Sequence, residues 1–387
     1  MESVKIGIIG FGNMGSDHAR RIMKHDIENM KLKAICDIDP DRLALAREKY
    51  GEELSYFEDY KSMLTCGIDS VLIATPHYFH PEMAIAAFEK GLNVICEKPA
   101  GVYTKQVREM NEAAEKSGKV FSMMYNQRTN PCYIKLRELI QSGELGELKR
   151  MVWIITTWFR TQAYYDSGTW RSTWVGEGGG TLINQNPHQL DLWQWLCGMP
   201  SRIRSVCYYG KYHDIEVEDD VTVFAEYDNG MSATYITSTG EYPGTNRLEI
   251  AGTKGKVIVE NDQFIFYRNQ QPDVDFIKTT EQTWGGPEVW EIKVPIAKQP
   301  ESQHNGILQN FANAVLKGEK LIAPGCEGIK GLTISNAIHL SSWTDDWVEL
   351  PVDEDKFYDM LQDKIKHSTV VKKEAKKKTA ESMEGSF

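Results

Sequence analysis

The 387-residue sequence has no CxxC pair, no long apolar run and no excess of basic residues. Its seven scattered cysteines argue against a disulfide framework and against a zinc site, and we expect no metal. Unpaired cysteines of this kind are typical of a reducing compartment, so the cytoplasm is the expected location. Because no segment approaches the roughly 20 apolar residues of a membrane helix and the N-terminus lacks a secretory signal, no membrane partner is expected.

The charge balance is acidic, with 55 Asp and Glu against 44 Lys and Arg and a net charge of −11. This balance argues against nucleic acid as a partner. The chain length favours two or three domains. The C-terminal residues 367–387 are lysine-rich with little apolar content, so we expect a disordered basic tail there.

The first part of the chain alternates short apolar runs with helical patterns. This rhythm indicates βα units and a parallel sheet with helices on both faces, so we predict an α/β, doubly wound domain over residues 1–126. Five strands are expected, near residues 4–10, 32–37, 70–75, 93–98 and 120–125.

The rhythm changes after residue 126, where long β-patterned runs follow one another with few helices between them. The turn signals DNG and GTKG lie where hairpins would place them. We therefore predict a second α/β domain over residues 127–366, built on a large, mostly antiparallel open sheet with helices on one face.

A glycine-rich loop follows the first expected strand, in the segment GIIGFGNMGSDHARRI. Gly10 would make the tight turn, Gly12 would let a pyrophosphate approach the backbone, and Gly15 would let helix and strand pack closely. The loop lies between a strand and a helix, and the next strand ends in Asp37, so we predict a dinucleotide site. The remaining loop residues assigned to it are Phe11, Asn13 and Met14.

The choice of dinucleotide depends on the end of the second strand. Asp37 would accept hydrogen bonds from the adenosine ribose, and Asp39 and Asp41 add negative charge that would repel a 2′-phosphate. NAD is therefore the predicted cofactor. NADP is the second choice because Arg42 lies one turn further on and could partly accommodate that phosphate.

The fourth strand ends in the sequence Glu97-Lys98-Pro99. Ligands of doubly wound sheets bind outside the carboxyl ends of the strands, so Glu97 and Lys98 are expected in the cofactor crevice. Lys98 could ease deprotonation of a substrate hydroxyl or hold the nicotinamide ribose. On its own, the tripeptide is equally consistent with a surface lysine.

A third segment, GGGTLINQNPHQLDLWQWLCG, places His188 at the start of a tryptophan-bearing helix. Asn186, Pro187 and Gly198 would bound this helix. Taken alone, the segment allows His188 to be either an early polar residue of a core helix or the base of an active site.

Three separated motifs together resemble the Gfo/Idh/MocA family, the relatives of glucose–fructose oxidoreductase and inositol dehydrogenase. They are the N-terminal GxGxxG, the stretch IATPHYFHPEMAIAAFEKGLNVICEKPAG and the GGGxxxNxxxH segment. The resemblance extends from the first strand to near Trp347. It implies an N-terminal Rossmann domain and a C-terminal α/β domain whose sheet often mediates oligomer contacts, so we expect a homo-oligomer, dimer or tetramer.

The resemblance also implies roles for individual residues. Lys98 would be catalytic and His188 the general base, while Asn184 stands where the family usually carries an aspartate. Asparagine can orient a hydroxyl or an imidazole, but it cannot carry negative charge. The cofactor would lie beside Thr75, Pro76 and His77.

We therefore expect NAD-dependent oxidation of a secondary hydroxyl of a sugar, glycoside or cyclitol to the ketone. An aromatic segment between the motifs suits the faces of a sugar ring, and the candidate substrate ligands are Tyr125, Arg128, Trp170 and Arg171. Two alternatives stay open: a glycosidase or glycoside 3-oxidation step through a transient keto-sugar, and a catalytically silent NAD-binding sensor.

Overall fold

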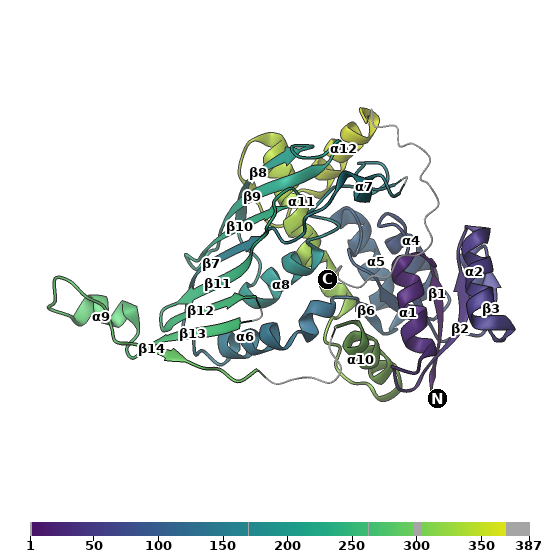
Figure 1. Cartoon of the computed structure of the whole chain (residues 1–387), viewed down its shortest axis with the longest axis horizontal. Helices are drawn as coiled ribbons and strands as arrows, with labels where there is room; N and C mark the ends of the chain where they lie inside the picture. Colours follow the sequence, from purple (N-terminus) through teal and green to yellow (C-terminus); the bar gives the residue numbers. More distant parts are fainter. Residues whose placement is uncertain (1, 169, 262, 297–302, 369–387) are drawn as a thin grey trace.

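The computed structural model describes residues 2–168, 170–261, 263–296 and 303–368. Two sheets lie apart in the molecule, each with its own helices, and a layer of helices lies between them (Figure 1). The predicted fold class is confirmed. The predicted division between residues 126 and 127 stays a prediction, and all of the basic tail beyond residue 368 lies outside the described residues.

The first sheet is parallel and has the strand order β3-β2-β1-β4-β5-β6. Its central strands are almost wholly buried, because helices cover both faces and leave only apolar side chains inside. The order reverses between β1 and β4, and this switch point is where such sheets bind ligands. The strands are β1 (Val4–Ile9), β2 (Met30–Cys36), β3 (Ser55–Phe57), β4 (Ser70–Ile73), β5 (Asn93–Cys96) and β6 (Phe121–Met123). The helices are α1 (Asn13–Met23), α2 (Pro40–Tyr50), α3 (Tyr60–Met63), α4 (Phe79–Glu89) and α5 (Thr104–Ser117), with the short 3-10 turn η1 (Gly51–Glu53).

The second sheet has the order β14-β13-β12-β11-β7-β10-β9-β8-β15 and is antiparallel except where β7 pairs with β10. The sequence pattern indicated its long strands, but not the two short edge strands β14 and β15. Its strands are β7 (Leu148–Ile155), β8 (Arg202–Tyr209), β9 (Glu218–Glu226), β10 (Ser232–Ser238), β11 (Asn246–Gly252), β12 (Gly255–Glu260), β13 (Gln263–Asn269), β14 (Val289–Ile292) and β15 (Val348–Glu349).

Two of the remaining helices, α10 and α11, pack against different sheets. Helix α11 packs against α8 and β8, whereas α10 returns to the first sheet and packs against β1 and η2 (Figure 1). Segments from the C-terminal third therefore complete both halves of the molecule. These elements are η2 (Asn126–Thr129), α6 (Pro131–Gln141), α7 (Gln162–Tyr165), α8 (Pro187–Cys197), α9 (Asp273–Thr279), α10 (Gln303–Lys317), η3 (Gly325–Glu327), α11 (Gly328–Thr344) and α12 (Glu354–Lys366).

The second sheet has one covered and one open face. Along β9, Val221, Val223 and Ala225 are buried, whereas Phe224 between them is 41% exposed. On β8, Val206 and Tyr208 are likewise exposed. This alternation is that of an antiparallel sheet with helices on one side only.

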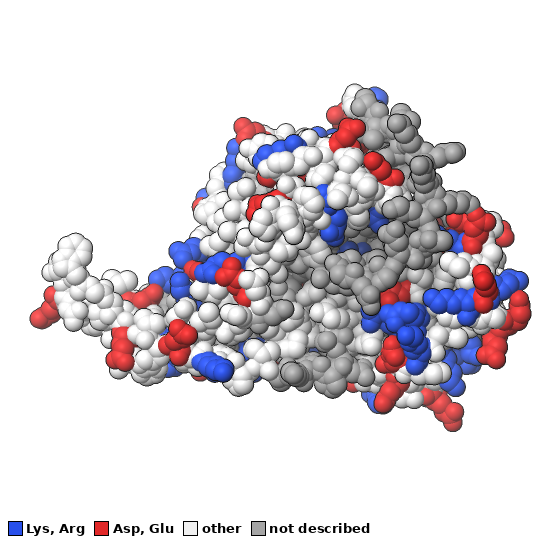
Figure 2. All heavy atoms as spheres, in the orientation of Figure 1, with Lys and Arg blue, Asp and Glu red and all other residues white. Residues whose placement is uncertain are grey.

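The outer surface is charged and mixed in sign. On the face that Figure 2 shows, acidic and basic side chains are interspersed over the described residues. Helix α9 stands away from the body of the molecule beside the sheet edge (Figure 1). Within the described ranges, no helix is long and apolar enough to cross a membrane.

Candidate active site

The glycine loop joins β1 to α1 at the switch point of the first sheet. Gly10 has φ +91°, and a Cβ there would lie 2.5 Å from the backbone oxygen of Ala74. A Cβ on Gly15 would lie 1.8 Å from the Gly10 oxygen. Only Gly12 is open, since no heavy atom lies within 4 Å of its ideal Cβ. Two glycines are therefore required by the fold, and the third leaves space that a phosphate could fill at the start of α1.

Asp37 lies against this loop from the end of β2. Its carboxylate accepts hydrogen bonds from the backbone N–H of Phe11 at 2.6 Å and of Asp39 at 2.9 Å. Arg42 donates to the Phe11 carbonyl at 3.2 Å, so a guanidinium also lies beside the loop. The Phe11 side chain is buried against Tyr50, whereas Asn13 is exposed and Met14 half-buried in the first turn of α1. The open side of Gly12 and the carboxylate of Asp37 together fit a dinucleotide.

The strand ends of β4 and β5 are held together by a histidine. His80 places one ring nitrogen 2.7 Å from the Thr75 carbonyl and the other 2.7 Å from the Pro99 carbonyl. The peptide bond between Lys98 and Pro99 is cis. His80 thus fixes the spacing between the turn at residues 75–77 and the turn that carries Lys98.

Glu97, which follows the end of β5, is paired with His18 of α1. Its Oε1 lies 2.6 Å from His18 Nε2, and its Oε2 accepts from the backbone N–H of Lys98 at 3.1 Å. Burial alone would raise the pKa of Glu97, but His18 more than offsets it and holds the value at about 2. Glu97 is therefore an anion that fixes the Lys98 turn to α1.

Lys98 reaches across to the second half of the chain. Its Nζ donates to the backbone oxygen of Asn184 at 2.8 Å. Burial lowers the pKa of Lys98, and the negative charges of Glu97 and Glu177 partly offset this. The ammonium thus lies between the carboxyl end of β5 and the segment that leads into α8.

His188 lies in the first turn of α8, four residues beyond Asn184. Its side chain is buried, and its ring meets that of Tyr125 edge-on at a centroid distance of 6.3 Å. Its Nδ1 has no hydrogen-bond partner among the described residues. Burial holds the pKa of His188 well below the ordinary value, and the charge of Lys98 lowers it further. The imidazole is therefore neutral at neutral pH, as a general base must be.

Helix α8 begins as the sequence indicated, with Asn186 at the N-cap, Pro187 first and Gly198 after its end. The Asn186 side chain, however, makes no capping hydrogen bond. It donates to Thr181 and Thr237 and accepts from Tyr235 at 2.6 Å. The side chain instead ties the start of α8 to β10.

The glycine run before α8 is held by a buried carboxylate, Glu218. Its oxygens accept from the backbone N–H groups of Gly180 and Leu182 at 2.9 Å, and one lies 3.0 Å from His339 Nε2. A Cβ on Gly180 would lie 2.1 Å from the Glu218 carbonyl oxygen. The small residue lets β9 approach this turn closely.

Four candidate substrate ligands occupy two different places. Trp170 contacts the His77 ring at 5.4 Å, and the Arg171 guanidinium lies over the rings of both Trp170 and Tyr164. His77 itself is buried, with Nδ1 3.2 Å from the Glu177 carbonyl. These residues cluster on the Asn184 side of Lys98.

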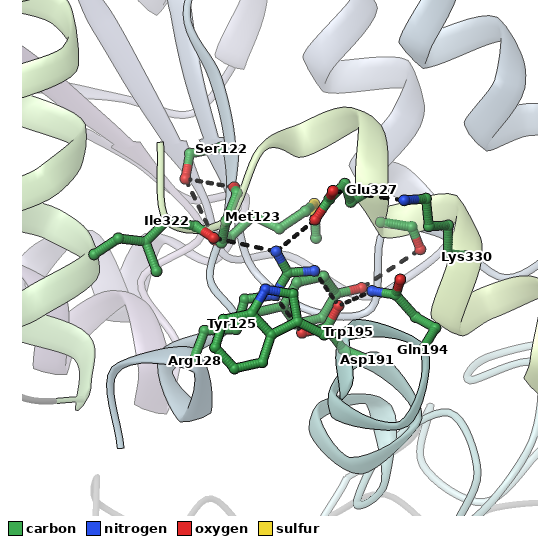
Figure 3. Close-up of polar contacts among 12 residues, drawn as sticks. Ser122, Met123, Tyr125, Arg128, Asp191, Gln194, Trp195, Ile322, Glu327 and Lys330 are labelled. Carbon is green, nitrogen blue, oxygen red and sulfur yellow. Dashed lines mark hydrogen bonds and ion pairs between the residues drawn. The ribbon is translucent and has the colours of Figure 1, made fainter. Parts of the chain in front are cut away.

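Tyr125 and Arg128 instead belong to a buried network (Figure 3). The guanidinium of Arg128 binds both oxygens of Asp191 at 2.7 and 2.8 Å, and it also reaches Glu327 and the Ile322 carbonyl. Four of its five N–H groups thus donate to protein oxygens. The Arg128 contacts join η2, α8 and the segment before α11.

The sequence reasoning did not single out three residues of this region: Glu177, Asp191 as a partner of Arg128, and Glu218. Each is a buried carboxylate whose partners are backbone N–H groups or distant side chains. The only local signal for Glu177 in the sequence was its place between Gly176 and Gly178. The roles assigned to individual site residues stay predictions.

Comparison with known proteins places this geometry in a family. Residues 4–125 match the model of the oxidoreductase family with an NAD-binding Rossmann fold, and residues 133–258 match the GFO/IDH/MocA C-terminal domain. The chain belongs to the Gfo/Idh/MocA family. It is accordingly an NAD-dependent oxidoreductase, as the sequence predicted.

Individual relatives are more distant. Myo-inositol 2-dehydrogenase of Thermotoga maritima is 26% identical over 67% of this chain and 75% of its own length. The scyllo-inositol 2-dehydrogenase (NAD(+)) of Bacillus subtilis is 25% identical over 66% of this chain and 73% of its own. Among solved structures, the WlbA dehydrogenase of Chromobacterium violaceum, in complex with NADH and UDP-GlcNAcA, is similar with a TM-score of 0.77 and 26% identity. That match covers 91% of this chain and 97% of the other.

The surroundings of Gly12 and Gly15 predict different effects of alanine substitution on NAD binding and on thermal stability. Gly12→Ala should leave the melting temperature within about 2 °C of wild type, because its Cβ meets no protein atom. The same change should weaken NAD binding at least about tenfold, because the methyl group occupies the space expected for phosphate. Quenching of the tryptophan fluorescence during titration with NAD would measure the binding, and thermal melts would measure the stability.

Gly15→Ala is the contrasting variant. Its Cβ overlaps the Gly10 oxygen, so the variant should lose thermal stability as well as NAD binding. Wild-type NAD affinity in Gly12→Ala would contradict the placement of the cofactor at this loop.

Proposed function

We propose that the chain oxidises a secondary hydroxyl of a sugar, glycoside or cyclitol to the ketone, with Lys98 and His188 handling the proton. The observation that carries the proposal is the hydrogen bond from Lys98 Nζ to Asn184 O at 2.8 Å. It brings the carboxyl end of a Rossmann strand against the segment that leads directly into His188. Bound NAD supplies the hydride acceptor, and Gly12 and Asp37 are the residues that would hold it.

The two side chains have complementary proton states. The neutral His188 imidazole can accept the hydroxyl proton as the carbinol is oxidised. The Lys98 ammonium can donate a hydrogen bond to the oxygen that becomes negative. Burial supports both tasks because it keeps His188 neutral and strengthens the electrostatic effect of Lys98.

The surroundings of Lys98 and the relatives both support the proposed substrate class. Trp170, Tyr164 and Arg171 present aromatic faces and hydrogen-bond donors beside His77, which suits the C–H faces and hydroxyls of a ring polyol. The two inositol dehydrogenases among the relatives act on cyclitols by their names. We therefore place cyclitols and sugars first in a substrate screen. The cytoplasmic location stays a prediction.

Replacement of either proton-handling residue should remove activity without removing cofactor. With NAD and a panel of cyclitols, sugars and glycosides, Lys98→Ala and His188→Ala should each lower kcat/KM by roughly 100-fold or more. The Kd for NAD should change little, because neither side chain lies at the glycine loop. Formation of NADH, followed by absorbance, is the measurement.

Other outcomes of the same assay distinguish the alternatives. Release of an aglycone without net NADH would favour a glycosidase. Tight NAD binding without turnover of any polyol would favour a sensor. Full activity in His188→Ala would overturn its assignment as the base.

We further propose that the open face of the second sheet joins copies of the chain into a homo-oligomer, dimer or tetramer. Val206, Tyr208 and Phe224 are large apolar side chains exposed on adjacent strands of that face. Adjacent exposed apolar groups are typical of a protein interface.

A charge on this face should separate the copies. Phe224→Glu is expected to lower the mass measured by light scattering, because a carboxylate would be buried in the interface. Leu45→Glu is the control, since Leu45 is 44% exposed on α2 of the other domain. A monomeric wild-type chain would contradict the proposal.

A further inference from the structure

Glu177 is a buried carboxylate at the centre of the site to which the proposed chemistry gives no task. Glu177 is only 1% exposed, and it immediately precedes the glycine run. One carboxylate oxygen accepts from the backbone N–H of Ser172 at 2.5 Å, and the other accepts from the side-chain amide of Asn184. Both contacts favour the ionised form of the group.

Asn184 connects Glu177 to Lys98. Its backbone oxygen accepts from Lys98 Nζ, while its side-chain Nδ2 donates to Glu177. No described residue donates to the remaining amide oxygen of Asn184. With Nδ2 committed to Glu177, the orientation of this amide is fixed, and its oxygen is left as an acceptor at the edge of the site.

Two carboxylates, Glu97 and Glu177, place negative charge near Lys98. Glu97 faces Lys98 but is already paired with His18. Burial raises the pKa of Glu177, and Arg171, the Ser172 N–H and Asn184 partly offset this. The charges of Glu97, Glu177, Arg160 and Arg171 act on Lys98, and Lys98 in turn acts on His77, His80 and His188. Glu218 acts on Glu177.

We propose that Glu177 is a positioning residue of the active site: it orients the Asn184 amide and supplies negative charge that keeps Lys98 protonated. This rests on the proposed function, in which the Lys98 ammonium stabilises the developing oxyanion. The site thereby gains a negative charge that Asn184 cannot carry. A purely structural Glu177 would only pin the Ser172 turn to the glycine run.

The first test reads Lys98 directly and needs no substrate. The full-length protein is treated with acetic anhydride at a series of pH values, and acetylation of Lys98 is followed by mass spectrometry of its peptide. Glu177→Gln removes the negative charge but keeps the size of the side chain. Because an anion favours the ammonium form, its loss should move the midpoint of Lys98 acetylation to lower pH.

Glu216→Gln is the matched control. Glu216 accepts from the backbone N–H of Trp174 at 2.7 Å, as Glu177 does from Ser172, but it is not among the charges that act on Lys98. This variant should leave the midpoint unchanged. An unchanged midpoint in Glu177→Gln would overturn the proposal.

The second test moves the negative charge from residue 177 to residue 184 and measures activity. Glu177→Gln should lower kcat/KM at least about tenfold and leave the Kd for NAD unchanged. In the double variant Glu177→Gln with Asn184→Asp, the new glutamine amide can donate to the new carboxylate, so one charge and one hydrogen bond are restored. Most of the lost kcat/KM should return.

A structural role predicts otherwise. Activity would then fall only in step with the melting temperature, and the double variant would not recover it. If the wild-type chain oxidised no polyol, the proposed function would fail, yet the acetylation midpoint would still decide the role of Glu177.

Discussion

The bond between Arg128 and Asp191 is the interaction on which the arrangement of the site depends. Both side chains are almost wholly buried, and the guanidinium meets the carboxylate with two parallel hydrogen bonds. Burial alone would lower the pKa of Arg128, but the charges of Asp191 and Glu327 more than offset this effect and raise the pKa above its usual value. The guanidinium therefore stays protonated. Removing one partner of such a pair typically costs about 3–5 kcal/mol, because the other charge is left buried.

The position of this pair explains its importance for function. Arg128 lies in η2, the turn that follows the last strand of the Rossmann sheet, and Asp191 lies one turn beyond His188 on α8. Gln194 also donates to Asp191 at 3.0 Å, and the Trp195 ring lies against Arg128 (Figure 3). The pair therefore fixes the helix of the proposed base against the domain that carries Lys98.

Buried carboxylates perform similar tasks elsewhere in the site. Glu97 fixes the Lys98 turn to α1, Glu177 holds Asn184, and Glu218 holds the glycine run. Each receives hydrogen bonds that offset the cost of burying its charge. These hydrogen bonds hold the backbone of the Lys98 turn and of the segment before α8, and such supporting contacts keep the residues of a site in place.

The sequence predicted the parts of this structure that depend on local patterns. Apolar strands between helices predicted the Rossmann sheet, and alternating runs predicted the large second sheet. The spacing of Gly10, Gly12 and Gly15 predicted the loop because steric limits on a turn act over a few residues. The order of the three motifs predicted the family, since each motif is a pattern of neighbouring residues that the sequence shows directly.

What the sequence could not predict are pairings between distant positions. Arg128 and Asp191 are 63 residues apart, and His18 and Glu97 are 79 apart. Nothing in the composition near Arg128 distinguishes a substrate ligand from a buried partner of a carboxylate. Asn186 shows the same limit, since its residue type predicted a cap, while Thr237 and Tyr235 of β10 offered it better partners.

The most direct test of this account is the kcat/KM of Asp191→Asn, measured with saturating NAD at a temperature where the variant is folded. The substitution keeps the size of the side chain but removes the charge that binds Arg128. The account predicts a fall of at least about tenfold in kcat/KM, because His188 shifts relative to Lys98, with no change in NAD affinity. Wild-type kcat/KM in the folded variant would contradict it.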